Sequence, residues 1–242
     1  MRLLRNEKRE EGLFNKIKDV LEAQEREGIH ASDLLAPRLA YFRRTHPLPL
    51  SEDQVGYFAG GQGHHMFLLH LETGSTSDTD EGSNLSEEYG ISYSPDLAKK
   101  QAEFKTARFI KEPETEAESI KMFDEYIKQC LVYALCEGKS RWHLYVLFIG
   151  LRAKMSIKPP RLRCYTLVWT KEELEEGREW IHGTVNGLHL ATKKKTVKHL
   201  PLCAEFKCVR FDQAINRKKI VCGYFAKCKP EGRWKQYKDL LS

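Results

Sequence analysis

Two short segments between residues 90 and 108 carry charged side chains that a hydrophobic core does not need. The first ends in a Pro-Asp pair at Asp96, and the second contains a Glu-Phe-Lys triplet from Glu103 to Lys105. In an extended strand Glu103 and Lys105 leave one face, and the phenylalanine between them leaves the other. If the two segments pair, two carboxylates and an ammonium meet. Such carboxylates suit Mg²⁺ or Mn²⁺, and the lysine could orient a water that attacks a phosphoryl group.

A helix predicted after these segments brings further polar groups. Thr115 and Glu118 have the spacing of a capping box, and apolar residues then recur at helical spacing up to Gly138. Gln129 and Tyr133 are four residues apart, so they lie on one face of this helix, where they could bond a phosphate or a base edge.

A histidine upstream offers a third metal ligand. His64 and His65 follow the run Gly-Gln-Gly, and a neutral imidazole is a common partner of carboxylates at a metal. We favour His65 and keep His64 as the alternative.

The elements needed to position these groups follow from periodicity and capping residues. We expect an amphipathic helix over 5–27, a turn capped by Ser32, a helix opening at Pro37, a helix over 64–69, an acidic loop over 72–88, strands over 141–150 and 161–169, and a helix over 170–188 with Thr170 as its cap. This order of helices and strands predicts an α/β fold with a central mixed β-sheet flanked by helices.

Length and hydropathy limit the class of protein. The 242 residues are 41% hydrophobic, enough for one domain with a real core. The charged amino terminus and the lack of long apolar runs predict neither a signal peptide nor a membrane span, so we expect a cytoplasmic protein without a membrane partner. Its oligomeric state is not indicated.

Charge is unevenly distributed along the chain. From residue 191 onward there are 14 Lys and Arg against 4 Asp and Glu, whereas the preceding part has 26 against 30. A basic segment beside an acidic body suits an anionic polymer such as DNA, although a solvated tail or turn has the same composition. The candidate nucleic-acid-binding residues are Arg43, Arg44, Lys193, Lys194 and Lys195.

The seven cysteines fall into two groups. Cys130, Cys136 and Cys164 lie in apolar runs and are expected to be buried thiols. The other four, spaced C-x4-C and C-x5-C, could hold a [4Fe-4S] cluster or Zn²⁺, or could remain reduced thiols; they are Cys203, Cys208, Cys222 and Cys228.

Taken in order, these motifs resemble a known family. A histidine after a glycine, then Pro-Asp, then Glu-x-Lys-Thr, then Gln-x-x-x-Tyr is similar to the RecB-type branch of the PD-(D/E)XK nuclease superfamily. Residues 29–44, IHASDLLAPRLAYFRR, resemble the N-terminal segment of the CRISPR-associated adaptation nuclease and its phage and archaeal-virus relatives. The resemblance extends from about residue 29 to 228.

This resemblance implies roles for the candidate residues. His65, Asp96 and Glu103, with the Phe104 carbonyl, would bind the catalytic metal. Lys105 would serve the attacking water, and Gln129 and Tyr133 would position the DNA strand.

The resemblance also implies an architecture and an activity. The chain would be a single nuclease domain over 1–242 with a restriction-endonuclease-like core, N-terminal helices over about 5–50 and a basic, cysteine-containing segment over about 195–242. It would be a DNA exonuclease acting on single-stranded or frayed ends, in the host cytoplasm if viral, with a helicase or recombination partner. The family's N-terminal cluster cysteine is replaced here by Ala36, so the four C-terminal cysteines would have to supply every ligand.

Two other readings remain open at this point. A non-catalytic nucleic-acid-binding or assembly subunit could keep the fold without turnover. An endonuclease or nickase in recombination or spacer capture would share the metal site and differ in the sizes of its products.

Overall fold

The computed structural model describes most of the predicted core. The described residues are 28–49, 84–107, 112–149 and 161–201, with Gly12, Asn15, 152–153, 156–157, Cys203, 209–212, 218–222, Tyr224 and Cys228. The helix expected over 64–69 and, apart from Gly12 and Asn15, the helix expected over 5–27 lie outside them.

The larger sheet contains the strands that carry the predicted chemistry. In the described part of the chain it has three strands, in the order β4 (Ala102–Ala107), β5 (Arg141–Phe148) and β8 (Arg161–Val168). Strand β4 runs parallel to β5, and β5 runs antiparallel to β8, so the sheet is mixed.

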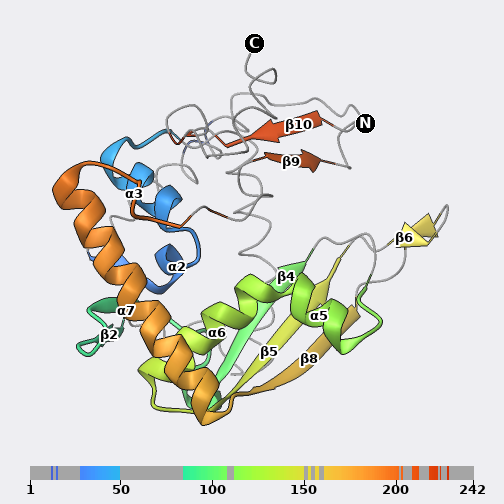
Figure 1. Ribbon diagram of the computed structural model, residues 1–242. Helices are drawn as coiled ribbons and strands as arrows, with labels where there is room; N and C mark the ends of the chain where they lie inside the picture. The colour runs from blue at the N-terminus through green and yellow to red at the C-terminus, as the bar shows by residue number, and fades with distance from the viewer. Residues whose placement is uncertain are drawn as a thin grey trace.

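Two helices connect the parallel strands and cover one face of this sheet (Figure 1). A parallel pair needs a crossover connection. It is supplied here by α5 (Glu116–Met122) and α6 (Asp124–Cys136). The α6 side of the sheet is lined by the buried members of β5, which alternate along the strand as Trp142, Leu144, Val146 and Phe148.

A second sheet precedes the first in the chain. Strand β3 (Ile91–Tyr93) is its centre, parallel to β1 (Ile29–His30) and antiparallel to β2 (Asn84–Ser86). The acidic loop expected over 72–88 therefore ends in a strand. The α/β fold class with mixed sheets and flanking helices is confirmed.

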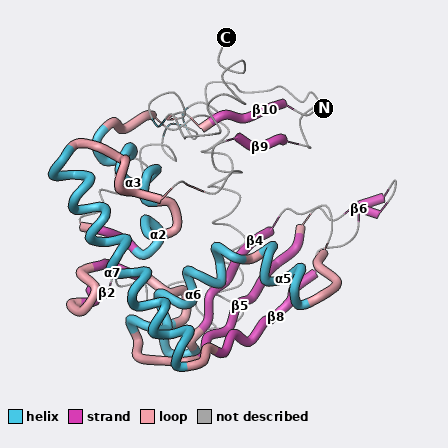
Figure 2. Tube along the Cα trace, viewed as in Figure 1, coloured by secondary structure: helices cyan, strands magenta, loops and turns pink. Residues whose placement is uncertain are grey.

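Helix α7 (Lys171–Lys194) is the longest described helix, and it packs against α6 and α3 (Figure 2). Its predicted cap is confirmed because the Thr170 hydroxyl accepts the Glu173 N–H, and the Glu173 carboxylate accepts the Thr170 N–H. The helix runs six residues past the predicted end. Lys193 and Lys194 belong to its last turn, so they do not lie in a loop as a solvated turn would require.

The N-terminal elements differ from prediction in one detail. Helix α3 (Pro37–Thr45) opens at Pro37 as expected. The short helix α2 (Ala31–Leu34) is capped by His30, whose ring accepts the Ser32 N–H, and the expected Ser32 cap was wrong.

Short elements complete the described chain. Residues 98–100 form a 3₁₀ turn, and two small antiparallel pairs lie further along, β6 (Arg152–Ala153) with β7 (Ser156–Ile157) and β9 (Val209–Asp212) with β10 (Lys218–Val221). No helix in the described part of the chain is both long and apolar enough to cross a bilayer.

Candidate active site

The predicted charged residues meet at the start of strand β4. The strand pairing that we expected between their two segments is reduced to a single antiparallel bridge, Leu97 to Ala102, because β3 pairs with β1 and β2. The turn between them is closed by Gln101 in the left-handed region, at φ 53°. This tight reversal, and not a ladder, brings Asp96 back beside Glu103.

Backbone amides hold the two carboxylates in a reciprocal arrangement. The Phe104 N–H donates to Asp96 Oδ2 at 2.6 Å, and the Asp96 N–H donates to Glu103 Oε2 at 3.3 Å. Each carboxylate thus accepts a hydrogen bond from a backbone amide of the segment that carries the other carboxylate. Asp96 is 8% exposed and Glu103 is 1% exposed, so both acids are removed from bulk water.

Lys105 supplies the positive charge of the site. Its Nζ lies 2.5 Å from Glu103 Oε1, and its side chain remains 21% exposed. As the period of a strand requires, Glu103 and Lys105 face α6, while Phe104 packs on the opposite face with Leu97 and Ala102.

Burial and charge shift the ionisation of these groups. Burial raises the pKa of Glu103 to about 7, with Lys105 opposing and Asp96 adding to the shift. For Lys105, burial alone lowers the pKa, but the carboxylates of Glu103 and Asp96 outweigh it and hold the pKa above its usual value. Two buried acids therefore share one partly exposed base, and a further cation at this place would relieve the repulsion between the acids.

Helix α6 places the predicted amide and phenol over the same strand. Gln129 Nε2 donates to Tyr133 Oη at 2.5 Å, as their spacing of four residues allows. Tyr133 is 1% exposed, and burial together with the nearby Glu103 raises its pKa well above the usual value. The structure thus brings together Asp96, Glu103, Phe104, Lys105, Gln129 and Tyr133.

Two residues that we did not select from the sequence also belong to this cluster. The Lys105 Nζ lies 5.8 Å from the centroid of the Tyr126 ring. Cys130 is fully buried, and burial followed by the charge of Glu103 raises its pKa. The signal that could have found them is spacing, because Tyr126, Cys130 and Tyr133 recur at helical period on one face.

The carboxylates fit a divalent cation, whereas the described cysteines do not fit a cluster. Mg²⁺ is commonly held by one or two carboxylates and keeps several waters, which matches Asp96 and Glu103. His65 and Cys208 lie outside the described residues. Among those described, no three His, Cys, Asp or Glu side chains gather at a place that could hold a metal, so Cys203, Cys222 and Cys228 do not form such a group.

The cysteines have other surroundings. Cys203 is buried, and Cys222 and Cys228 pack at the edge of the main core. Three thiols were expected to be buried. Cys130 is buried as predicted, Cys136 is half-buried, and Cys164 is exposed. Cys164 departs from the prediction because it projects from β8 on the face that does not contact the main core, in register with Tyr145.

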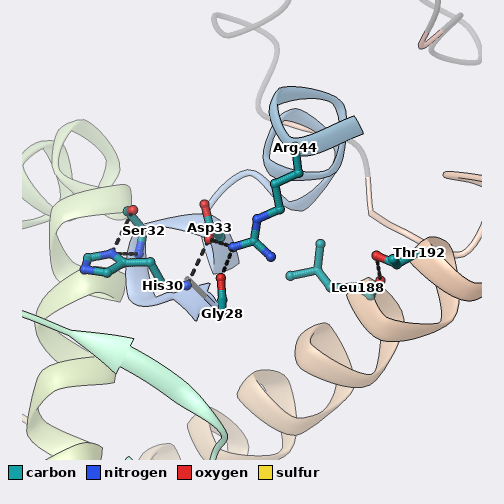
Figure 3. Close-up of polar contacts among 7 residues, drawn as sticks. All are labelled: Gly28, His30, Ser32, Asp33, Arg44, Leu188 and Thr192. Carbon is teal, nitrogen blue, oxygen red and sulfur yellow. Dashed lines mark hydrogen bonds and ion pairs between the residues drawn. The ribbon is translucent and has the colours of Figure 1, made fainter. Parts of the chain in front are cut away.

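The predicted basic residues lie at one end of two neighbouring helices. Arg43 and Arg44 end α3, and Lys193 to Lys195 end α7, with these five side chains exposed. Arg44 is engaged within the protein, because its Nη2 lies 2.5 Å from both the Asp33 Oδ2 and the Gly28 carbonyl oxygen (Figure 3).

No protein-family model and no curated protein sequence matches the chain. Solved structures similar to it include the following three. The crystal structure of SSO0001 is 16% identical, covering 73% of this chain and 85% of that one, with a TM-score of 0.49. A phage-related exonuclease from Haemophilus somnus 129PT is 10% identical over 76% and 99% of the two chains, with a TM-score of 0.46. LHK-Exo, solved in complex with dAMP, is 19% identical over 76% and 98%, with a TM-score of 0.41. Because these TM-scores are low, the chemistry of the site rests on the residues of this chain alone.

Proposed function

We propose that the protein is a metal-dependent DNA nuclease of the RecB-like PD-(D/E)XK type, acting as an exonuclease on single-stranded or frayed ends. The observation that carries this proposal is the convergence of Asp96, Glu103 and Lys105 at the start of β4. Two buried carboxylates beside a lysine on a strand edge have no role in packing, and their burial costs stability. The combination suits phosphodiester hydrolysis.

In this proposal Asp96 and Glu103 hold Mg²⁺ or Mn²⁺, with His65 and the Phe104 carbonyl as further ligands. When bound, the cation would supply a water of lowered pKa and stabilise charge on the phosphoryl group. Lys105 donates hydrogen bonds toward the attacking water, since its partly exposed ammonium is the donor next to the carboxylates. No ligand role is proposed for the C-terminal cysteines.

The substrate strand would be positioned by groups around this centre. The half-buried Gln129 would contact the strand, while the buried Tyr133 holds its amide in place. The basic ends of α3 and α7 would attract the phosphate backbone, with Arg43 and Lys193 to Lys195 as the contributing residues.

End-labelled single-stranded DNA tests the proposal. We expect products in Mg²⁺ or Mn²⁺ that disappear in EDTA, and a loss of roughly a hundredfold or more in Lys105→Ala, as for other groups that stabilise charge in a transition state. Lys128→Ala is the matched control, because that exposed lysine pairs only with Asp124 among the described ion pairs.

The size of the products separates the subclasses. Mononucleotides or short ends indicate an exonuclease, and long internal fragments indicate an endonuclease or nickase. If the folded wild type cleaves neither single-stranded, double-stranded nor flap DNA, the nuclease proposal fails and a binding subunit takes its place.

A further inference from the structure

The proposed metal ligand Glu103 already has a cation beside it. Its two oxygens are used differently: Oε2 accepts the Asp96 N–H, and Oε1 is 2.5 Å from the Lys105 ammonium. The ammonium therefore lies against the carboxylate oxygen that is not tied to the backbone. A metal ion that binds through Oε1 must share or displace this contact.

The same ammonium also lies over an aromatic ring while it contacts Glu103. The Lys105 Nζ is 5.8 Å from the centroid of the Tyr126 ring, within the range of a cation–π interaction. The ring is held by stacking on Phe123, at a centroid distance of 6.1 Å and an interplanar angle of 12°. Phe123 itself is 2% exposed and fixed in the core, so the aromatic face is in place before any rearrangement of the lysine.

We infer that Lys105 and the divalent cation are alternative partners of Glu103 Oε1, and that the Tyr126 ring, which the Lys105 ammonium already faces, keeps the ammonium when the cation binds. This inference rests on the proposed function, since it uses the same metal site. It assigns Lys105 a role in metal affinity and makes Tyr126 a positioning residue.

The physical reason lies in the burial of the site. Glu103 is 1% exposed, so in the absence of a metal ion its charge needs an internal partner, and Lys105 is that partner. A metal ion removes the need for this pair and would repel the ammonium at short range. The Tyr126 ring can still stabilise the Lys105 ammonium through a cation–π interaction after the metal ion has replaced it at Glu103.

Direct binding of Mn²⁺, without nucleic acid, tests the inference. The free-ion signal in electron paramagnetic resonance reports the dissociation constant. We expect Lys105→Met to bind Mn²⁺ roughly tenfold more tightly than wild type, because the competing charge is gone. Tyr126→Leu should bind Mn²⁺ about threefold more weakly, whereas Tyr126→Phe, which keeps the ring, should match wild type.

Lys128→Met is the matched control, since it removes one exposed lysine on α6 that does not contact Glu103. An equal gain in Lys128→Met would overturn the inference, because net charge would then explain the effect. An unchanged affinity in Lys105→Met would overturn it as well, while leaving the proposed metal site intact. Unchanged binding in Tyr126→Leu would remove the role of the ring.

The failure of the proposed function has a separate signature. If neither wild type nor Lys105→Met binds Mn²⁺ with folding confirmed by circular dichroism, the metal site itself is wrong and the inference falls with it. Should Lys105→Met fail to fold, Lys105→Gln keeps a polar side chain at this position and carries the same expectation.

Discussion

Glu103 is the residue at which the demands of function and stability oppose each other most directly. A carboxylate that is 1% exposed is costly in the folded protein, and its pKa of about 7 expresses that cost. The backbone amide of Asp96 and the ammonium of Lys105 reduce it without removing it. Packing does not account for this cost, whereas the proposed role of Glu103 as a ligand of a divalent cation does.

The same residue predicts how stability depends on pH when no metal is bound. Between about pH 4.5 and about pH 7 the folded protein holds the Glu103 proton while the unfolded chain has released it, so the free energy of unfolding falls as pH rises through this window. The loss is complete above the folded pKa and amounts to about 3 kcal/mol at most.

Urea unfolding in EDTA at about pH 5 and about pH 8 measures this dependence. Glu103→Gln should lose less stability than wild type between the two pH values, because glutamine does not titrate. Equal losses in the two proteins would show that Glu103 does not carry the pH dependence.

At the scale of elements, the site depends on how closely α6 and α7 approach. Gly177 of α7 permits this approach, because a Cβ atom at that position would lie 3.0 Å and 3.1 Å from side-chain atoms of Leu135 and Leu131. Helix α6 carries the glutamine and tyrosine of the candidate site, and it packs between α7 and strand β5, the neighbour of β4.

Two glycines of one helix give a matched prediction. At Gly183 a Cβ atom would meet nothing within 4 Å, so Gly183→Ala should raise the free energy of unfolding by up to about 1 kcal/mol through helix propensity. At Gly177 the alanine would press on α6, and overpacking of about 1–3 kcal/mol offsets that gain.

Thermal or urea unfolding should therefore rank Gly183→Ala above wild type and Gly177→Ala below Gly183→Ala by at least about 1 kcal/mol. An equal rise in the free energy of unfolding of both variants would mean that the α6 side chains move away from residue 177 without a loss of stability.

At the scale of the molecule, charge separates along α7. Glutamates fill its first turns and lysines its last, in agreement with the helix dipole, and the helix packs against α3, whose last turn carries arginines. The C-terminal excess of positive charge in the sequence thus begins at a defined surface of the fold. This surface is the place to look for contacts with a phosphate backbone.

The dependence of DNA binding on salt tests this surface. Changing Lys193, Lys194 and Lys195 together to Gln should reduce the slope of log K against log salt on single-stranded DNA by about 2, since each phosphate contact contributes about 0.7. The control changes the exposed lysines Lys121, Lys128 and Lys139 to Gln, which removes the same charge elsewhere. If both triple variants reduce the slope equally, the net charge of the protein, and not this surface, determines the salt dependence of DNA binding.

Much of the local structure can be predicted from the sequence, because it depends on residues that are close along the chain. Thr170 predicts the start of α7, Pro37 the start of α3, and alternation predicts which residues of β4 face α6. The clustering of Asp96, Glu103 and Lys105 could be expected for the same reason, since only seven residues separate the carboxylates.

The tertiary structure decided what depends on contacts between distant segments. Strand β3 pairs with β1 and β2, so a turn and two backbone amides, not a ladder, align Asp96 with Glu103. Cys164 is exposed although its segment is apolar, because its side chain leaves the sheet on the face away from the main core. The ring of Tyr126 beside Lys105 likewise required α6 to be placed on β4. Such contacts are selected by burial in three dimensions, which local spacing does not encode.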